Sequence, residues 1–341
     1  MKKLVYVGFA YRHHKGTHAG YHHVKDFLQY DKIIDCQKEF EFLFFEKKYA
    51  SILKRILRRL YAIVFGDGCP CAMLRALVYS WMHKDDVTFH IIYGDNIYAR
   101  FFYKFRRSNH QVVATVHQPL ERYNVNKKYR NKLLWPDHLV ILATNELNEF
   151  KKITGKDNVT YIPHGICTDY YMPDENIKQN GSVLMVGNWL RNFELAKDVF
   201  KKIKEEFPEI VINMVGSPVR KEIFSPYVNY YSGISDDDLL KLYRESSVMY
   251  LPIKRFTANN ALLEAGATGC NILISTDNPG DNTYIPNEYI NFCDTSVSCN
   301  VTSIVYGIKN ASVNYGLRKY VIDNFAWKKI SVKIEQLLLT V

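Results

Sequence analysis

Residues 259–275 read Asn259-Asn-Ala-Leu-Leu-Glu-Ala-Gly-Ala-Thr-Gly-Cys-Asn-Ile-Leu-Ile-Ser275. An asparagine able to cap a helix precedes a helical pattern over 259–268, and the apolar run over 270–275 predicts a buried strand. The start of such a helix offers unpaired backbone N–H groups and the positive end of the helix dipole, which favour an anion. Glu264, about one and a half turns along, could bind two sugar hydroxyls beside that anion. Taken alone, an exposed helical acid is the simpler interpretation.

Short apolar runs alternate with helical patterns along the rest of the chain. The predicted strands are 3–9, 88–93, 111–117, 138–143, 159–163, 182–187, 210–216, 247–252 and 270–275. The predicted helices are 22–30, 50–65, 145–154, 194–206, 236–245 and 259–268. Such alternation indicates parallel sheets covered by helices on both faces.

The polar segment 172–181 separates two such series of strands and helices. We therefore expect an α/β protein with two Rossmann-like domains that face each other across a cleft, residues 1–170 and residues 171–325. Residues 326–341 are expected to form a C-terminal helix that could pack back on the first domain. In open parallel sheets ligands bind at the carboxyl ends of the strands, so the loops there are the candidate sites.

Composition and charge restrict the class of protein. Of 341 residues, 47% are hydrophobic, which excludes intrinsic disorder. Residues 1–135 hold 24 Lys and Arg against 11 Asp and Glu, so we expect an anionic partner for this half. No helix-turn-helix, zinc-finger or RRM signature accompanies the charge, which argues against nucleic acid. Scattered cysteines, odd in number, and no apolar run of about 18 residues favour a cytoplasmic protein without a membrane span.

Residues 51–64 form the most basic amphipathic pattern of the chain. At about 100° per residue, one face of this predicted helix is apolar and the other carries Lys54, Arg55, Arg58 and Arg59. Such a helix can lie on an anionic bilayer, and a second cluster, Lys104, Arg106 and Arg107 beside three phenylalanines, favours the same interpretation. We therefore expect a peripheral position on the inner face of the membrane. The alternative is a helix packed on its own domain with a solvated basic face.

Four stretches, in order, resemble motifs of the GT-B glycosyltransferases, in particular of the retaining glycosyltransferase family 4. Residues 263–272, Leu-Glu-Ala-Gly-Ala-Thr-Gly-Cys-Asn-Ile, resemble its donor-binding motif. Residues 160–173 resemble its domain-crossing segment, residues 183–187 its first donor-domain strand, and residues 323–329, with Trp327, the start of its C-terminal helix. The chain departs from the family at three positions. The family has an acidic residue eight positions before the one matched by Glu264, and this chain has Phe256 there. Asn188 and Phe193 stand where the family usually has an Arg and a Lys.

The resemblance implies roles for specific residues. Glu264 would bind the ribose of a nucleotide-diphosphate sugar, and Arg191 would serve the diphosphate in catalysis. The rest of the donor site would be formed by Gly187, Asn188, Arg255, Asn259, Asn260 and Ala261. His117 would be the catalytic-site histidine, contacting the transferred sugar or the acceptor. A loop with Gly16, His18 and Gly20 would border the acceptor and the donor phosphates, and no metal or cofactor is expected.

The activity implied is that of a hexosyltransferase-type glycosyltransferase. A sugar would move from the nucleotide sugar, a co-substrate, to a hydroxyl of a glycan or lipid-linked acceptor, in bacterial-type polysaccharide or glycolipid assembly. The resemblance implies retention of anomeric configuration; an inverting reaction with Asp95 or Glu121 as base stays open. The alternatives are a nucleotide-sugar epimerase of the same fold and a non-catalytic nucleotide-sugar-binding subunit. An oxidoreductase is disfavoured because no G-x-G-x-x-G follows a predicted strand.

Overall fold

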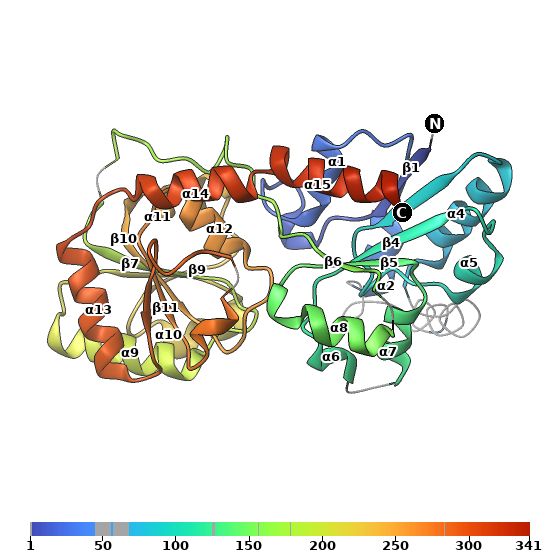
Figure 1. Ribbon diagram of the computed structural model, residues 1–341. Helices are drawn as coiled ribbons and strands as arrows, with labels where there is room; N and C mark the ends of the chain where they lie inside the picture. The colour runs from blue at the N-terminus through green and yellow to red at the C-terminus, as the bar shows by residue number, and fades with distance from the viewer. Residues whose placement is uncertain are drawn as a thin grey trace. The chain divides into compact units, whose positions relative to one another are not determined.

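The computed structural model describes residues 2–44, 56, 68–124, 127–155, 157–177, 179–282 and 284–341 (Figure 1). The chain forms two compact units. Unit 1 comprises Met1–Lys15, Gly20–Pro163 and Ile330–Val341, and unit 2 comprises Gly16–Ala19 and His164–Lys329. The amphipathic pattern predicted over 51–64 lies, apart from residue 56, outside the described residues.

Unit 1 is built on a six-stranded parallel sheet with the strand order β2-β1-β3-β4-β5-β6. Its strands are β1 (Lys3–Gly8), β2 (Lys32–Asp35), β3 (Val87–Ile91), β4 (Gln111–Val116), β5 (His138–Ile141) and β6 (Val159–Tyr161). Its helices are α1 (Val24–Phe27), α2 (Gln37–Phe44), α4 (Pro70–Met82), α5 (Arg100–Phe105), α6 (Glu121–Asn124), α7 (Lys127–Leu134) and α8 (Leu147–Thr154). The chain leaves β1 for one edge of the sheet and then returns to build the other side from β3.

Unit 2 repeats this architecture with the strand order β12-β11-β10-β7-β8-β9, again all parallel. Its strands are β7 (Ser182–Val186), β8 (Ile212–Val215), β9 (Asn229–Tyr231), β10 (Ser246–Pro252), β11 (Ile272–Ser275) and β12 (Asn291–Cys293). Its helices are α9 (Phe193–Glu206), α10 (Lys221–Phe224), α11 (Asp236–Glu245), α12 (Asn260–Ala267), α13 (Val297–Lys309) and α14 (Tyr315–Phe325).

The central strand β7 is buried on both faces. Leu184 and Val186 belong to one apolar cluster with Leu262 of α12, whereas Val183 and Met185 belong to another with side chains of α9 and α13. Burying each such side chain stabilises the fold by about 1.5–3 kcal/mol. Because both faces need apolar residues, the strand reads as a continuous apolar run, as the sequence pattern indicated.

The α/β class with two parallel sheets is confirmed, and all nine predicted strands are present with ends that differ by a few residues. The pattern missed three strands, β2, β9 and β12, and each of them is an edge strand. Their burial patterns contain one buried residue or none, so no apolar run marks them. An edge strand is held by backbone hydrogen bonds to one neighbour, and the sequence does not display that pairing.

The segment that the sequence predicted to cross between the domains pairs with the backbone around residues 325–327. The Ile166 N–H donates to the Phe325 carbonyl over 2.8 Å, and the Trp327 N–H donates to the Ile166 carbonyl over 3.1 Å. Gly165 lies against the buried Trp327 ring, and a Cβ at that position would be 2.4 Å from ring atoms. These contacts bring residues 164–170 into unit 2, so the chain changes unit at 163/164, seven residues before the division expected from the sequence.

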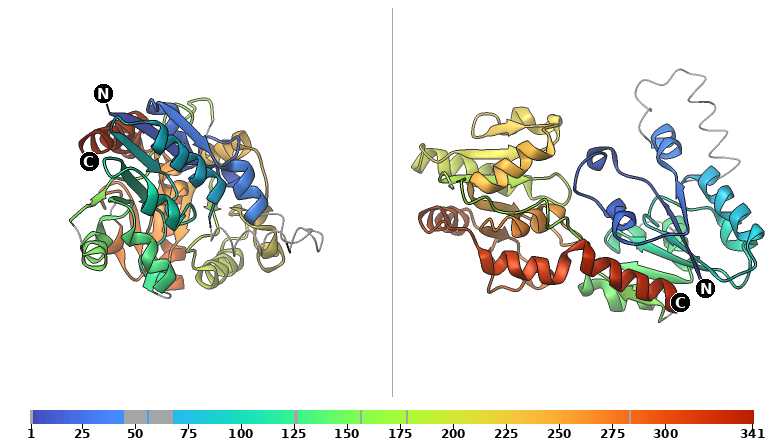
Figure 2. Two further views of the ribbon diagram at one scale, coloured as in Figure 1. Left: turned by 90° about the vertical axis from the view of Figure 1, so that its right-hand side faces the viewer. Right: turned by 90° about the horizontal axis from the view of Figure 1, so that it is seen from above.

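The last helix, α15 (Trp327–Thr340), contributes to both units (Figure 2). Its residues through Lys329 lie in unit 2, and those from Ile330 onward lie in unit 1. In unit 1 the Thr88 hydroxyl of β3 donates to the Leu338 carbonyl over 2.9 Å. The side chain of Ile334 is fully buried there, so the end of the chain is part of the core of unit 1.

Candidate functional site

The strand order of unit 2 reverses between β7 and β10, and in such sheets ligands bind outside the carboxyl ends of the strands at the reversal. The loops that follow these two strands run together. Arg191 and Ile253 form an antiparallel bridge. The Asn192 N–H donates to the Pro252 carbonyl, and the Lys254 N–H donates to the Leu190 carbonyl, both over 2.9 Å. The backbone at the candidate site is therefore fixed by its own hydrogen bonds.

Arg191 is the central cation of this site and is 7% exposed. Its Nε donates to the Val186 carbonyl over 3.1 Å, its Nη1 to the Trp189 carbonyl over 3.2 Å, and its Nη2 to Asn259 Oδ1 over 3.2 Å. Burial lowers the pKa of Arg191 to about 10, so the guanidinium is charged at neutral pH. Gly187, with a φ of 95°, leaves room for it, because a Cβ there would be 3.1 Å from Nη2. These contacts use three of the five N–H donors of the guanidinium.

Helix α12 begins beside Arg191, as the sequence predicted. Asn259 is its N-cap, and Oδ1 of this residue accepts from the Leu262 N–H over 3.3 Å as well as from Arg191. The N–H groups of Asn260 and Ala261 lie in the first turn of the helix, at the positive end of its dipole. A fixed cation and the start of a helix thus lie together, an arrangement that suits a phosphate group.

Glu264 lies further along α12 and is only 4% exposed, so the interpretation as an exposed helical acid is wrong. The Tyr243 hydroxyl of α11 donates to Glu264 Oε2 over 2.8 Å. Burial raises the pKa of Glu264 to about 7; the Tyr243 hydrogen bond and the Arg191 charge lower it, and the Asp236 charge raises it. The carboxyl group is therefore held in one orientation inside the unit.

The remaining donor-site candidates lie on the same loops. Asn188 is exposed, and its Oδ1 accepts from the Ser217 N–H over 2.9 Å, which joins the loops after β7 and β8. Arg255 is half-buried on the loop after β10. Phe256 is 3% exposed and belongs to the apolar cluster that contains Leu262. The position at which the resembled family has an acid is thus filled by part of the core.

In unit 1, His117 follows β4 and is half-buried. Its ring Nε2 donates to the Ile92 carbonyl over 2.8 Å, and its backbone N–H donates to Asp95 Oδ2 over 2.8 Å. Burial lowers the pKa of His117, so the ring is neutral at neutral pH. The Asp95 carboxylate also accepts from the Tyr123 hydroxyl, so it holds this turn together. Glu121, the other carboxylate considered as a base, is exposed in α6.

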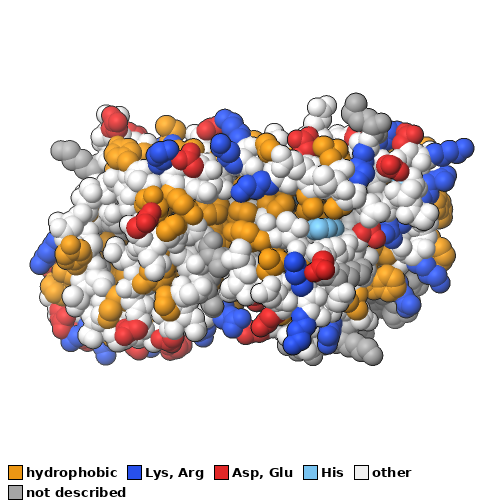
Figure 3. All heavy atoms as spheres, in the orientation of Figure 1, with side chains coloured by type: hydrophobic (Ala, Val, Ile, Leu, Met, Phe, Trp, Pro, Cys, Tyr) orange, Lys and Arg blue, Asp and Glu red, His pale blue; other side chains and the backbone are white. Residues whose placement is uncertain are grey.

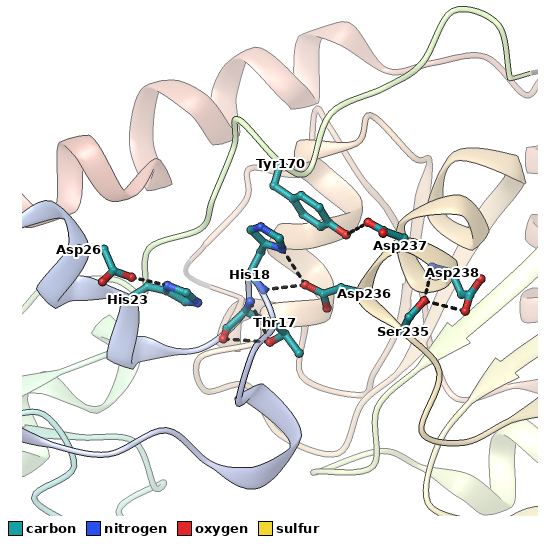
Figure 4. Close-up of polar contacts among 10 residues, drawn as sticks. Thr17, His18, His23, Asp26, Tyr170, Ser235, Asp236, Asp237 and Asp238 are labelled. Atoms are coloured by element: carbon teal, nitrogen blue, oxygen red, sulfur yellow. Dashed lines mark hydrogen bonds and ion pairs between the residues drawn. The ribbon is translucent and has the colours of Figure 1, made fainter. Parts of the chain in front are cut away.

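The glycine-rich loop after β1 divides between the units, since Gly16–Ala19 belong to unit 2 and Gly20 to unit 1. Gly16 and Gly20 have φ of 77° and 106°, values that favour glycine. His18 contacts Asp236 and stacks on Tyr170 in unit 2 (Figure 4). No group of three His, Cys, Asp or Glu that could hold a metal was found among the described residues.

The sequence did not identify Tyr243, Asp236 and Tyr170 as neighbours of the predicted site. Tyr243 lies with Leu239 and Leu240 on the apolar side of the helix predicted over 236–245. This pattern predicts that the Tyr243 side chain is buried, but it does not indicate which residue the hydroxyl bonds. Ser235 and the three acidic residues after it predict the start of a helix. In the structure the Ser235 hydroxyl accepts from the Asp238 N–H over 3.1 Å. Contacts to Glu264 and His18 depend on the tertiary fold.

No family model and no curated protein matches this sequence. Solved structures match across nearly the whole chain. A glycosyltransferase from Rickettsia africae is 14% identical, with 98% of this chain and 97% of that chain covered and a TM-score of 0.65. HepE from Anabaena, solved with UDP and glucose, is 9% identical, with 100% of both chains covered and a TM-score of 0.65.

The N-terminal domain of trehalose-6-phosphate phosphatase from Candida albicans is 12% identical, with 100% of this chain and 97% of that chain covered and a TM-score of 0.69. At such identities the likeness is one of fold. The chain has the GT-B fold of these glycosyltransferases, as the resemblance implied. A fold hosts several functions, so the activity must be argued from the site.

Proposed function

We propose that the protein is a glycosyltransferase that uses a nucleotide-diphosphate sugar. The observation that carries the proposal is the contact of Arg191 with Asn259, which joins a buried cation to the start of α12 at the strand reversal of unit 2. Glu264 lies on the same helix with its carboxyl group held by Tyr243. The cation and the helix start suit a diphosphate, and the carboxylate suits the hydroxyl groups of the ribose attached to it.

The chemistry of transfer follows from these groups. Negative charge builds on the diphosphate as its bond to the sugar breaks, and donors that are already oriented there lower the barrier. Arg191 and the positive end of the α12 dipole would supply this stabilisation, and Glu264 would accept hydrogen bonds from the two ribose hydroxyls. Gly187, Asn188 and Arg255 would complete the walls of the donor site.

Unit 1 would bind the acceptor, a glycan or a lipid-linked glycan, in polysaccharide or glycolipid assembly. His117 stays the predicted catalytic-site histidine; its Nε2 is engaged by Ile92, so it would act as an orienting group on the sugar or acceptor. Retention, which the resemblance implies, stays a prediction. An inverting reaction needs a protein base, and Asp95 already accepts three hydrogen bonds, two of them from backbone N–H groups.

A thermal-shift screen with UDP-, GDP-, ADP-, TDP- and CMP-sugars tests donor binding, because a ligand of the folded form raises the melting temperature. We expect one of these donors to raise it. The Glu264→Gln variant, which keeps a partner for Tyr243 but loses the charge, should fold and show a much smaller shift. If none of the five donors shifts the wild-type protein, the proposed function is wrong.

A non-catalytic nucleotide-sugar-binding subunit is the second candidate, and the buried Phe256 favours it, since an acid of the resembled motif is missing there. Such a subunit would bind the donor without releasing nucleoside diphosphate. An epimerase would release an altered sugar without any acceptor. The products formed from the donor found in the screen distinguish all three.

We also propose that the protein is cytoplasmic and that it takes a peripheral position on the membrane. The exposed side of α4 carries four apolar side chains, Leu74, Val78, Trp81 and Met82, between 43% and 74% exposed, together with Arg75. Phe105 beside it is 54% exposed, and Lys104 lies over the Phe105 ring. Arg106 of the predicted basic cluster is instead paired with Asp137, and on the face drawn in Figure 3 basic and acidic side chains are interspersed. In the described part of the chain, no helix meets the length and hydropathy of a membrane span.

Sedimentation with phosphatidylglycerol vesicles at physiological salt tests this position. We expect the wild-type protein to bind, and the Met82→Glu variant to bind several-fold more weakly because it places a negative charge in the apolar face. Val219→Glu, at an 86% exposed position of unit 2, is the matched control and should bind as the wild type does. Wild-type protein that stays in the supernatant would refute the membrane position and leave the donor site untouched.

A further inference from the structure

Two of the seven cysteines are in contact at the β12 edge of the sheet in unit 2. Cys293 ends β12, and Cys299 lies in the first turn of α13. The Cys299 thiol donates to the Cys293 sulfur, and the two sulfur atoms are 2.6 Å apart. A disulfide bond is about 2.0 Å long, so the sulfurs need to approach by only about half an ångström to form one.

The turn between the two cysteines is fixed by hydrogen bonds of its own. The Ser296 hydroxyl, at the N-cap of α13, accepts from the Cys299 N–H over 3.3 Å. The side-chain amide of Asn300 donates to the Asp294 carbonyl over 2.9 Å and to the Ser296 carbonyl over 2.7 Å. Because Asn300 is fully buried, these bonds anchor the turn in the unit. The fold of the turn therefore keeps the two thiols together.

The two thiols differ in their access to solvent. Cys299 is half-buried, whereas Cys293 is 5% exposed and lies 3.0 Å from the Ser303 hydroxyl of α13. Burial raises the pKa of the Cys293 thiol, so this residue keeps its proton at neutral pH. A dissolved reagent thus meets Cys299 first, and Cys293 lies in contact behind it.

This arrangement is typical of a pair in which oxidation of the first thiol ends in a disulfide with the second. The contact between Cys36 and Cys69 in unit 1 differs from it, because these side chains are 1% and 0% exposed. An oxidant in solution does not reach either of them in the folded protein. Access, and not only the distance between sulfurs, distinguishes the pair in unit 2.

We propose that Cys293 and Cys299 are a reversible oxidation site, at which hydrogen peroxide converts the two thiols into a disulfide. The inference is independent of the proposed glycosyl transfer. Disulfides in a reducing compartment are transient, so the bond would form in response to peroxide and be opened again by a dithiol.

The reaction has two steps. In the first, the thiolate of Cys299 attacks one oxygen of hydrogen peroxide: an S–O bond forms, the O–O bond breaks, and the hydroxide that leaves takes up the former thiol proton. The product is a sulfenic acid on Cys299. In the second, the Cys293 sulfur attacks the Cys299 sulfur: the S–S bond forms, the S–O bond breaks, and the leaving hydroxide takes the Cys293 proton. Two thiols and one peroxide thus give one disulfide and two molecules of water.

The experiment treats the folded full-length protein with hydrogen peroxide, blocks the remaining thiols with N-ethylmaleimide and cleaves the chain before its aspartates. Cleavage before Asp294 places Cys293 in peptide 281–293 and Cys299 in peptide 294–322. Mass spectrometry should find these two peptides joined, with two hydrogens fewer than their sum, and dithiothreitol should separate them. The Cys293→Ser variant cannot form the bond, so dimedone should label Cys299 in it as a sulfenic acid.

The matched control is Cys71→Ser, which removes an exposed cysteine of unit 1 and should leave the amount of joined peptide unchanged. Cys299→Ser should lose the joined peptide completely. Wild-type peptides 281–293 and 294–322 that stay separate, each with its thiol blocked by N-ethylmaleimide, overturn the inference. A bond from peptide 294–322 to peptide 238–276, which holds Cys270, overturns it as well, because Cys299 would then have a different partner.

Discussion

Replacing Arg191 with alanine should lower sugar transfer by about 10²–10³-fold, the usual effect of removing one oriented donor from a developing negative charge. The guanidinium is buried and charged, and its bonds to Val186, Trp189 and Asn259 fix its orientation. The measurement is kcat/KM for the donor, from release of nucleoside diphosphate. The kcat/KM of Arg191→Lys should lie between those of the wild type and Arg191→Ala, because an ammonium group keeps the charge but not the three directional bonds.

Urea unfolding of the same variants separates catalysis from folding, since the lost bonds to Val186 and Asn259 also reduce stability. Arg220→Ala is the control: its guanidinium covers the Phe193 ring, 3.6 Å from the centroid, and the proposed donor site does not include it. It should leave transfer unchanged. A folded Arg191→Ala protein with nearly wild-type kcat/KM would remove Arg191 from the site.

The free energy of unfolding should depend on pH through Glu264. The pKa of this residue is about 7 in the folded chain, above its ordinary value of 4.5, mainly because it is buried. The folded chain keeps the proton to a higher pH than the unfolded chain, so stability present below pH 4.5 is lost as the pH rises through 7. At about 1.4 kcal/mol per pH unit, the loss amounts to about 3 kcal/mol.

Glu264→Gln supplies the comparison, since a neutral amide can still accept from Tyr243 and does not titrate. Urea unfolding of both proteins at pH 4.5, 6 and 8 isolates Glu264, because contributions from the other groups cancel in the difference. We expect the wild type to lose about 3 kcal/mol relative to the variant over this range. A difference that stays constant or rises with pH would mean that the carboxyl group is solvated in the folded protein.

Patterns within a few residues predicted most of the fold. The central strands of both sheets were found because burial on two faces requires continuous apolar runs, as in β7. The start of α12 at Asn259 was found because a cap and the first turn lie within four residues of each other. The edge strands β2, β9 and β12 were missed, since their stability comes from pairing with a neighbour rather than from their own apolar residues.

The sequence by itself determined the two parallel α/β sheets and the loops in which a ligand site could lie, because periodicity and capping are local. Only the tertiary structure decided which side chains meet in those loops. Arg191 reaches Asn259 across 68 positions, and His18 reaches Asp236 across 218. It also decided that Glu264 is buried and that Phe256 fills the core. Such contacts depend on how helices and strands that are far apart in the sequence pack together, and a local sequence pattern does not contain this information.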